Sequence, residues 1–115
     1  MACSNDITMT VMNTLIQKPH ESKYCTSVVE GATLFAALNK IQDSDKKFSF
    51  TYTVDKNLGL FLESVNGLYG SKEDHTFWEL LSDEEPLNTG IGCYQLKEKD
   101  QIILKLKKCL SLGLP

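Results

Sequence analysis

The stretch that decides the fold is Glu30-Gly31-Ala32-Thr33-Leu34-Phe35-Ala36-Ala37-Leu38-Asn39-Lys40-Ile41. Its apolar residues Leu34, Leu38 and Ile41 recur at the three- and four-residue spacing of one helix face. The two adjacent alanines have high helix propensity, and the carboxylate of Glu30 suits the positive end of a helix dipole. The sequence therefore predicts one helix over residues 30–41.

On both sides of this stretch, apolar residues alternate with polar ones, which is typical of β-strands. The predicted strands cover residues 7–12, 24–29, 48–54, 60–65, 76–81, 94–96 and 101–107. Asn66-Gly67 is a strong hairpin-turn dipeptide. Burying one helix on one sheet gives an α+β domain. We expect a β-grasp-like arrangement, with one helix packed on a mixed sheet and an additional short β-hairpin layer.

The expected core follows from this arrangement. The chain of 115 residues is long enough for one domain, residues 1–115, with one modest core. The first and last strands should pair at the centre of the sheet, and the three apolar helix residues should face it. The strand residues that they should meet are Phe48, Phe50 and either Leu104 or Ile103.

Composition and motifs exclude several function classes. The net charge is −3 and no basic stripe follows a helix, so we expect no nucleic-acid partner. No apolar run approaches the roughly 20 residues of a membrane span, so we expect no membrane insertion. No motif of a hydrolase, metalloprotease or nucleotide-binding protein occurs, and both histidines and the acidic run Asp83-Glu84-Glu85 fall in predicted polar loops. We therefore expect no enzyme activity, no catalytic cofactor and no metal site.

The four cysteines, Cys3, Cys25, Cys93 and Cys109, are widely spaced and form no Cys-x-x-Cys pair. An even number in a short chain favours disulfides and secretion, whereas free buried cysteines in a cytosolic protein are the alternative. No signal peptide is recognisable, so we expect Met1 to be an added start on a mature secreted chain. Four cysteines can pair in three ways, and we expect Cys3–Cys93 and Cys25–Cys109. The second strand should place Cys25 toward the far end of the last strand, near Cys109.

Trp78, the only tryptophan, has two interpretations. It either packs in the core, or it lines a ligand wall beside the loop Leu87-Asn88-Thr89-Gly90. Asn88 offers both donors and an acceptor, and Gly90 lets a ligand approach the backbone. The residues alone leave both interpretations open.

Five segments in a common order resemble a known family. They are Val29-Glu30-Gly31-Ala32-Thr33-Leu34, Phe48-Ser49-Phe50, Gly59-Leu60-Phe61-Leu62-Glu63-Ser64-Val65-Asn66-Gly67, Thr76-Phe77-Trp78-Glu79-Leu80-Leu81 and Pro86-Leu87-Asn88-Thr89-Gly90-Ile91. Together they are similar to the C-terminal β-domain of the cobalamin carriers: transcobalamin, intrinsic factor and haptocorrin. In that family the β-domain closes over a cobalamin held against a larger helical barrel. The resemblance implies ligand contacts at Gly59, Leu60, Phe61, Trp78, Leu87 and Asn88.

The sequence also departs from the family. The helical barrel has no counterpart in these residues, and Leu58 stands where members often have Trp. Phe77 and Glu79 replace the usual Tyr and Gln, which removes a hydroxyl group and adds a charge.

The resemblance implies a secreted, non-catalytic protein that binds cobalamin (vitamin B12) or a related corrinoid. The alternative is a protein-interaction or signalling module that kept the fold and lost the ligand. A homo-oligomer or a receptor is the further partner that we consider.

Overall fold

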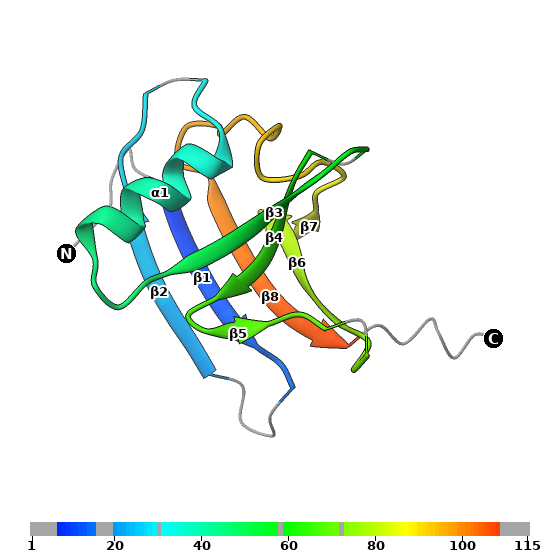
Figure 1. Ribbon diagram of the computed structural model, residues 1–115. Helices are drawn as coiled ribbons and strands as arrows, with labels where there is room; N and C mark the ends of the chain where they lie inside the picture. Colours follow the sequence, from blue (N-terminus) through cyan, green and yellow to red (C-terminus); the bar gives the residue numbers. More distant parts are fainter. Residues whose placement is uncertain (1–6, 16–19, 30, 58, 72, 109–115) are drawn as a thin grey trace.

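The computed structural model describes residues 7–15, 20–29, 31–57, 59–71 and 73–108. A five-stranded mixed sheet runs in the order β2-β1-β8-β6-β7. Its strands are β1 (Ile7–Asn13), β2 (His20–Thr26), β6 (Thr76–Ser82), β7 (Glu85–Pro86) and β8 (Gln101–Lys108). β1 and β8 are parallel neighbours at its centre, as predicted (Figure 1).

A second, smaller sheet contains β3 (Phe50–Asp55), β4 (Gly59–Val65) and β5 (Leu68–Tyr69), all antiparallel. The turn between β4 and β5 is Asn66-Gly67, with φ angles of 53° and 83°. Two successive positive φ values define the tight hairpin turn that this dipeptide favours. The predicted hairpin layer is therefore confirmed, with one further strand.

The described residues contain the helix α1 (Leu34–Ser44), which begins later than predicted. Thr33 has extended backbone angles, and its side chain accepts a hydrogen bond from the N–H of Ala36, so it is the N-cap. Gly31, with φ at 85°, lies before the helix. The predicted start at Glu30 is therefore wrong, because the helix begins at Leu34.

One apolar core unites the helix and both sheets. Leu34, Leu38 and Ile41 are each at most 1% exposed, as expected for residues that face the sheet. Phe48, Phe50 and Leu104 belong to the same buried cluster, whereas Ile103 is partly exposed on the other face of β8. Figure 1 shows α1, β3 and β4 crossing the same side of the central strands.

Two predicted strands differ from the structure. Residues 94–96 do not form a strand; Gln95 makes only an isolated bridge with Thr33. The carbonyl of Tyr94 accepts the N–H of Leu34, and the N–H of Leu96 donates to Ala32. This segment therefore binds the start of the helix instead of a strand. β2 begins and ends earlier than the predicted 24–29, because its register with β1 runs from His20 to Thr26.

The cysteines depart from the expected pairing. Cys93 is a free, exposed thiol, so the predicted Cys3–Cys93 bridge is wrong. Cys25 is disulfide-bonded. It lies opposite Thr8, which in turn lies opposite the first residue of β8. β2 therefore returns Cys25 to the beginning of β8, contrary to the reason for expecting Cys25–Cys109. Cys3 and Cys109 lie outside the described residues.

No helix in the described part of the chain is long and apolar enough to cross a membrane.

Candidate functional site

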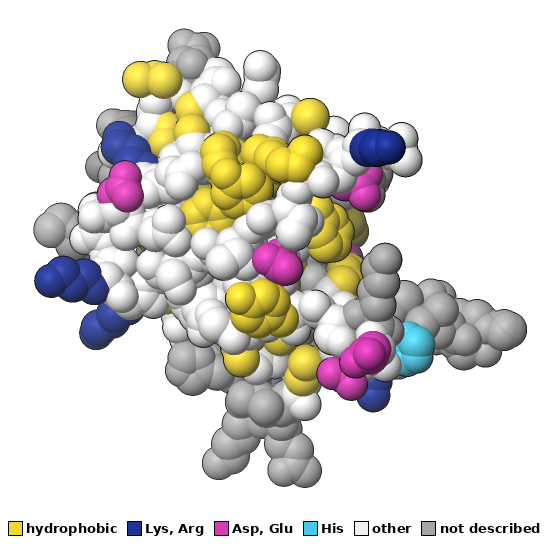
Figure 2. Space-filling view, viewed as in Figure 1, with side chains coloured by type: hydrophobic (Ala, Val, Ile, Leu, Met, Phe, Trp, Pro, Cys, Tyr) yellow, Lys and Arg dark blue, Asp and Glu magenta, His cyan; other side chains and the backbone are white. Residues whose placement is uncertain are grey.

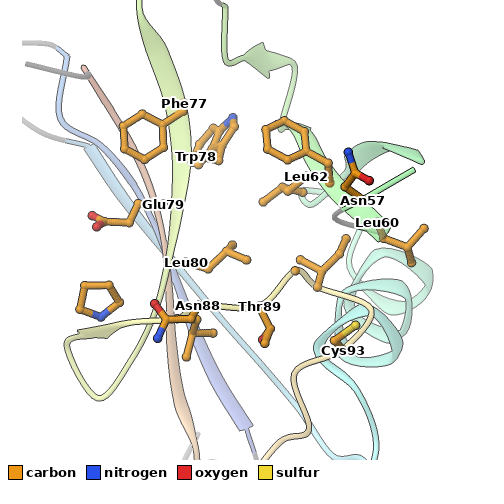
Figure 3. A pocket seen from close by; sticks show the side chains of 15 residues that line it. Asn57, Leu60, Leu62, Phe77, Trp78, Glu79, Leu80, Asn88, Thr89 and Cys93 are labelled. Carbon is orange, nitrogen blue, oxygen red and sulfur yellow. The ribbon is translucent and has the colours of Figure 1, made fainter. Parts of the chain in front are cut away.

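A cavity of about 480 Å³ opens between β4, β6 and the loop that follows β7 (Figure 3). Of the residues that the family resemblance predicted as contacts, those that line the cavity are Leu60, Phe61, Trp78, Leu87 and Asn88. Gly59 begins β4 and is not among the lining residues. The structure thus brings together residues that lie far apart in sequence, on two strands and one loop. Their role as ligand contacts stays a prediction.

Two incompletely paired strands border the cavity. β6 pairs with β8 along its whole length, but on its other side β7 reaches only Leu81 and Ser82. β4 pairs with β3 along its length, with one irregularity at Glu63, whereas β5 reaches only Ser64 and Val65. The remaining parts of both edges, residues 77–80 and 59–62, have no further strand beside them in the described chain. The cavity therefore offers main-chain hydrogen-bonding groups as well as apolar side chains.

The main chain of β6 indicates which groups are offered. The carbonyl of Leu80 accepts a hydrogen bond from the N–H of Leu87 at 2.8 Å. The main-chain N–H and carbonyl of Leu80 therefore point away from β8. Main-chain groups of an antiparallel strand alternate between its two edges. The N–H and carbonyl of Trp78 therefore point to the same edge, where an amide-bearing ligand can bind.

Trp78 fits both of its interpretations. It is only 5% exposed, and its indole N–H donates to the carbonyl of Leu68 at 2.9 Å. It is thus a core residue, and it also lines the cavity. In Figure 3, Trp78 and Leu80 point from β6 toward the β4 side.

Glu79 does not place its charge on the apolar side of the cavity. Figure 3 shows Phe77 and Glu79 pointing away from the side that Trp78 faces. The carboxylate of Glu79 forms an ion pair with Lys107 at 3.3 Å. Phe77 and Glu79 nevertheless border the cavity, because the edge of β6 forms part of the cavity wall. The two departures from the family pattern therefore leave the apolar side intact.

Phe61 supplies accessible apolar surface to the cavity. Its side chain is 47% exposed, whereas Leu62 beside it is buried. Figure 2 shows apolar side chains gathered over the face where β3 and β4 cross the molecule. An exposed aromatic ring next to an open edge is a surface that a flat ligand can cover.

The loop that closes the cavity, residues 87–94, is called the wall segment below. The N–H of Phe35 donates to the carbonyl of Ile91 at 2.8 Å, and that of Leu34 to Tyr94 at 2.9 Å. These are two of the N–H groups that every helix leaves unpaired at its start. The wall segment is therefore attached to the N-terminus of α1.

The wall segment also contacts β4. A Cβ atom on Gly92 would lie 2.9 Å from Cδ1 of Leu60, so only glycine lets the Leu60 side chain pack this closely. Sequence reasoning missed Asn57, Ile91, Gly92 and Cys93 as site residues. The short spacing of the glycines, Gly90-Ile91-Gly92, was the available signal of close backbone packing.

A buried polar cluster holds the far end of the wall segment. Asp100 is 1% exposed. Its carboxylate accepts hydrogen bonds from Ser82 Oγ at 2.5 Å, Tyr94 Oη at 2.7 Å and the N–H of Lys97 at 3.0 Å. Burial alone would raise the pKa of Asp100, but these donors outweigh it and hold the pKa below its usual value. Burial raises the pKa of Tyr94.

Within the described ranges, no group of three or more His, Cys, Asp or Glu side chains is placed to hold a metal ion. The geometry suits noncovalent binding of a large ligand with a flat apolar surface and polar substituents.

Fold and cavity together define a small α+β domain with an open, largely apolar binding groove. The family model described as "Domain of unknown function (DUF4430)" matches residues 31–108, and the chain belongs to that family. The resemblance to the cobalamin carriers is confirmed by two curated relatives. Cobalamin binding intrinsic factor of Canis lupus familiaris is 33% identical over 66% of this chain. Transcobalamin-1 of Homo sapiens is 30% identical over 71%.

A solved structure of haptocorrin in complex with Cbi has the same fold, with a TM-score of 0.72 and 23% identity over 96% of this chain. The chain spans only a part of these relatives. It covers 18% of the canine protein, 19% of the human one and 27% of the haptocorrin chain. The similarity therefore concerns one domain of larger proteins.

Proposed function

We propose that this chain is a non-catalytic binding protein for a corrinoid, cobalamin or a related compound, held in the cavity between β4 and β6. The observation that carries the proposal is that Leu60, Phe61, Trp78, Leu87 and Asn88 line one cavity. The two curated relatives are cobalamin carriers by name, and the haptocorrin structure contains Cbi. Apolar side chains would cover the macrocycle, and the strand edges would bind its amide groups.

The expected affinity is modest. A corrinoid is larger than a cavity of about 480 Å³, so only part of it can enter. One apolar wall and a few main-chain hydrogen bonds give about −5 to −7 kcal/mol, a dissociation constant of tens to hundreds of micromolar. In a larger carrier, a second domain would raise the affinity by holding the ligand at high effective concentration. A second copy of this chain could do the same.

The test is a titration with cobinamide and cobalamin, followed by calorimetry and by quenching of the single tryptophan. Trp78→Ala is a poor variant, because Trp78 is buried and its loss would cost about 3–5 kcal/mol of stability. Phe61→Ala is better, because Phe61 is 47% exposed. It should weaken binding about tenfold with the fold intact.

The matched control is Tyr69→Ala. Tyr69 is an exposed aromatic residue of the same small sheet, but it does not line the cavity. Its loss should leave the affinity unchanged. Absence of binding at high micromolar protein, or an equal effect of both variants, would contradict the proposal.

The alternative function, an interaction module, is favoured by a different surface. β3 is an edge strand, and Thr51 to Asp55 are all exposed. Tyr52 and Val54 are 43% and 76% exposed, and no charged residue precedes Asp55 in the strand. Such an edge can pair with a strand of a second copy. Concentration-dependent sedimentation that Val54→Lys abolishes and Phe61→Ala preserves would support this function.

Secretion is part of the proposal. A disulfide at Cys25 suits an oxidising compartment. Detection of the natural protein in culture medium, with Cys25 oxidised, is the corresponding measurement.

A further inference from the structure

The wall segment, residues 87–94, is hydrogen-bonded at three places: to β6, to the start of α1 and to Asp100, which precedes β8. At its beginning, the N–H of Leu87 donates to Leu80 of β6. In its middle and at its end, Ile91 and Tyr94 accept the first N–H groups of α1. The side chain of Tyr94 reaches further, to the carboxylate of Asp100. The first two attachments are main-chain bonds and the third is a side-chain hydrogen bond, in addition to the burial of Ile91 in the core.

We infer that Asp100 is a positioning residue of the cavity: through Tyr94, it holds the wall segment between the start of α1 and Leu60. The inference rests on the proposed function for its effect on corrinoid binding, but not for its effect on the wall segment. Asp100 does not line the cavity, and neither does Tyr94. Their effect on a ligand must therefore act through the residues that they hold.

The geometry explains how the effect is transmitted. Tyr94 Oη donates to Asp100 at 2.7 Å, while the Tyr94 carbonyl accepts from Leu34. Tyr94 thus links a buried carboxylate, through its side chain, to the helix N-terminus, through its main chain. Two residues earlier, Gly92 packs against Leu60, which borders the cavity. If Tyr94 moves, the carbonyl of Ile91 and the contact with Leu60 move with it.

Two variants separate positioning from general stability. Asp100→Asn tests the carboxylate directly, but it leaves buried donors unpaired and can unfold the protein. Tyr94→Phe and Ser82→Ala each remove one hydroxyl group that donates to Asp100. Tyr94 belongs to the wall segment, whereas Ser82 belongs to β6 and does not line the cavity. Ser82 Oγ also lies 3.0 Å from Tyr94 Oη, but Ser82→Ala keeps the 2.7 Å bond from Tyr94 to Asp100, so it is the matched control for that bond.

The first readout needs no ligand. Amide hydrogen exchange, followed by NMR, reports on the N–H groups of Leu34 and Phe35, which bind the wall segment. In Tyr94→Phe these two amides should exchange about tenfold faster relative to that of Leu104 in the core. In Ser82→Ala all three should change together. Equal patterns in the two variants would overturn the inference.

The second readout is the dissociation constant for cobinamide, measured by tryptophan quenching. Tyr94→Phe should weaken binding about tenfold, and Ser82→Ala by less than twofold. Faster exchange without weaker binding would show that the wall segment does not position the ligand, and would also overturn the inference. If the unmodified protein does not bind cobinamide, the proposed function fails, and the exchange measurement alone decides whether Tyr94 holds the wall segment.

Discussion

The buried carboxylate of Asp100 depends on the hydrogen-bond donors that surround it. A carboxylate that is 1% exposed is stable only because hydroxyl and amide donors surround it. Lys97 also forms an ion pair with Asp83, but both side chains are exposed, so this ion pair adds little to stability. The hydrogen bonds therefore carry the interaction, and they favour the ionised form of Asp100.

This arrangement predicts how stability depends on pH. The pKa of Asp100 is lower in the folded protein than its ordinary value of 3.8. Its contribution is therefore fully present above about pH 4 and is lost as the pH falls through the lowered pKa. Asp100→Asn should lower the free energy of unfolding by about 1.5–3 kcal/mol at neutral pH. The difference should shrink below about pH 4 in urea denaturation measured at several pH values.

Glu98→Gln provides the control, because Glu98 is an exposed carboxylate close in sequence. It should show no comparable difference. A stability gap for Asp100→Asn that stays constant down to pH 2 would contradict the assigned role of its charge.

The elements differ in how well sequence predicts them. Period and propensity located α1 and its buried face, because apolar spacing reflects packing directly. They misplaced its first residue, because Thr33 caps the helix through a side-chain hydrogen bond that spacing does not reveal. Residues 94–96 were predicted as a strand from alternation of apolar and polar residues, yet their main chain binds the start of α1. Most of the proposed ligand contacts were inferred from the family resemblance. The roles of Gly92 and Asp100 could not be predicted, because these residues act through tertiary contacts.

The helix carries a clear prediction of its own. Leu38 is fully buried in the core cluster, so Leu38→Ala should lower the free energy of unfolding by about 2–5 kcal/mol. The exposed residue Asp43 of the same helix is the control, and Asp43→Ala should stay within about 0.5 kcal/mol. Thermal and urea denaturation measure both. A shift of only a degree or so for Leu38→Ala would contradict the observed packing.

At the scale of the whole molecule, the sheet register decides which cysteines can meet. Cys25 lies at the end of the sheet where β8 begins. Lys108, the last residue of β8, lies opposite Thr76. Strands rise by about 3.3 Å per residue, so the two ends of β8 are more than 20 Å apart. A disulfide spans only about 4.4–6.8 Å between Cα atoms.

We therefore predict that Cys25 is bonded to Cys3 and that Cys93 is a free thiol. Cys3 precedes Ile7, which pairs with Thr26 beside Cys25. Each of the four cysteines lies on a different tryptic peptide, because lysines separate them. Non-reducing peptide mass mapping should find the first cross-link and an alkylated Cys93. A cross-link between the peptides of Cys25 and Cys109 would show that the register argument fails.

The parallel pairing of β1 with β8 also has a consequence for how the chain folds. Thr14 and Leu106, which are hydrogen-bonded, are 92 residues apart in sequence. The centre of the sheet therefore cannot form until nearly the whole domain has left the ribosome. Closing so long a loop before any central strand pair is gained makes folding slow, on the scale of milliseconds to seconds. During synthesis, the apolar faces of β1 and α1 stay exposed until β8 has been made. This chain should therefore depend on chaperones more than a helical domain of similar size.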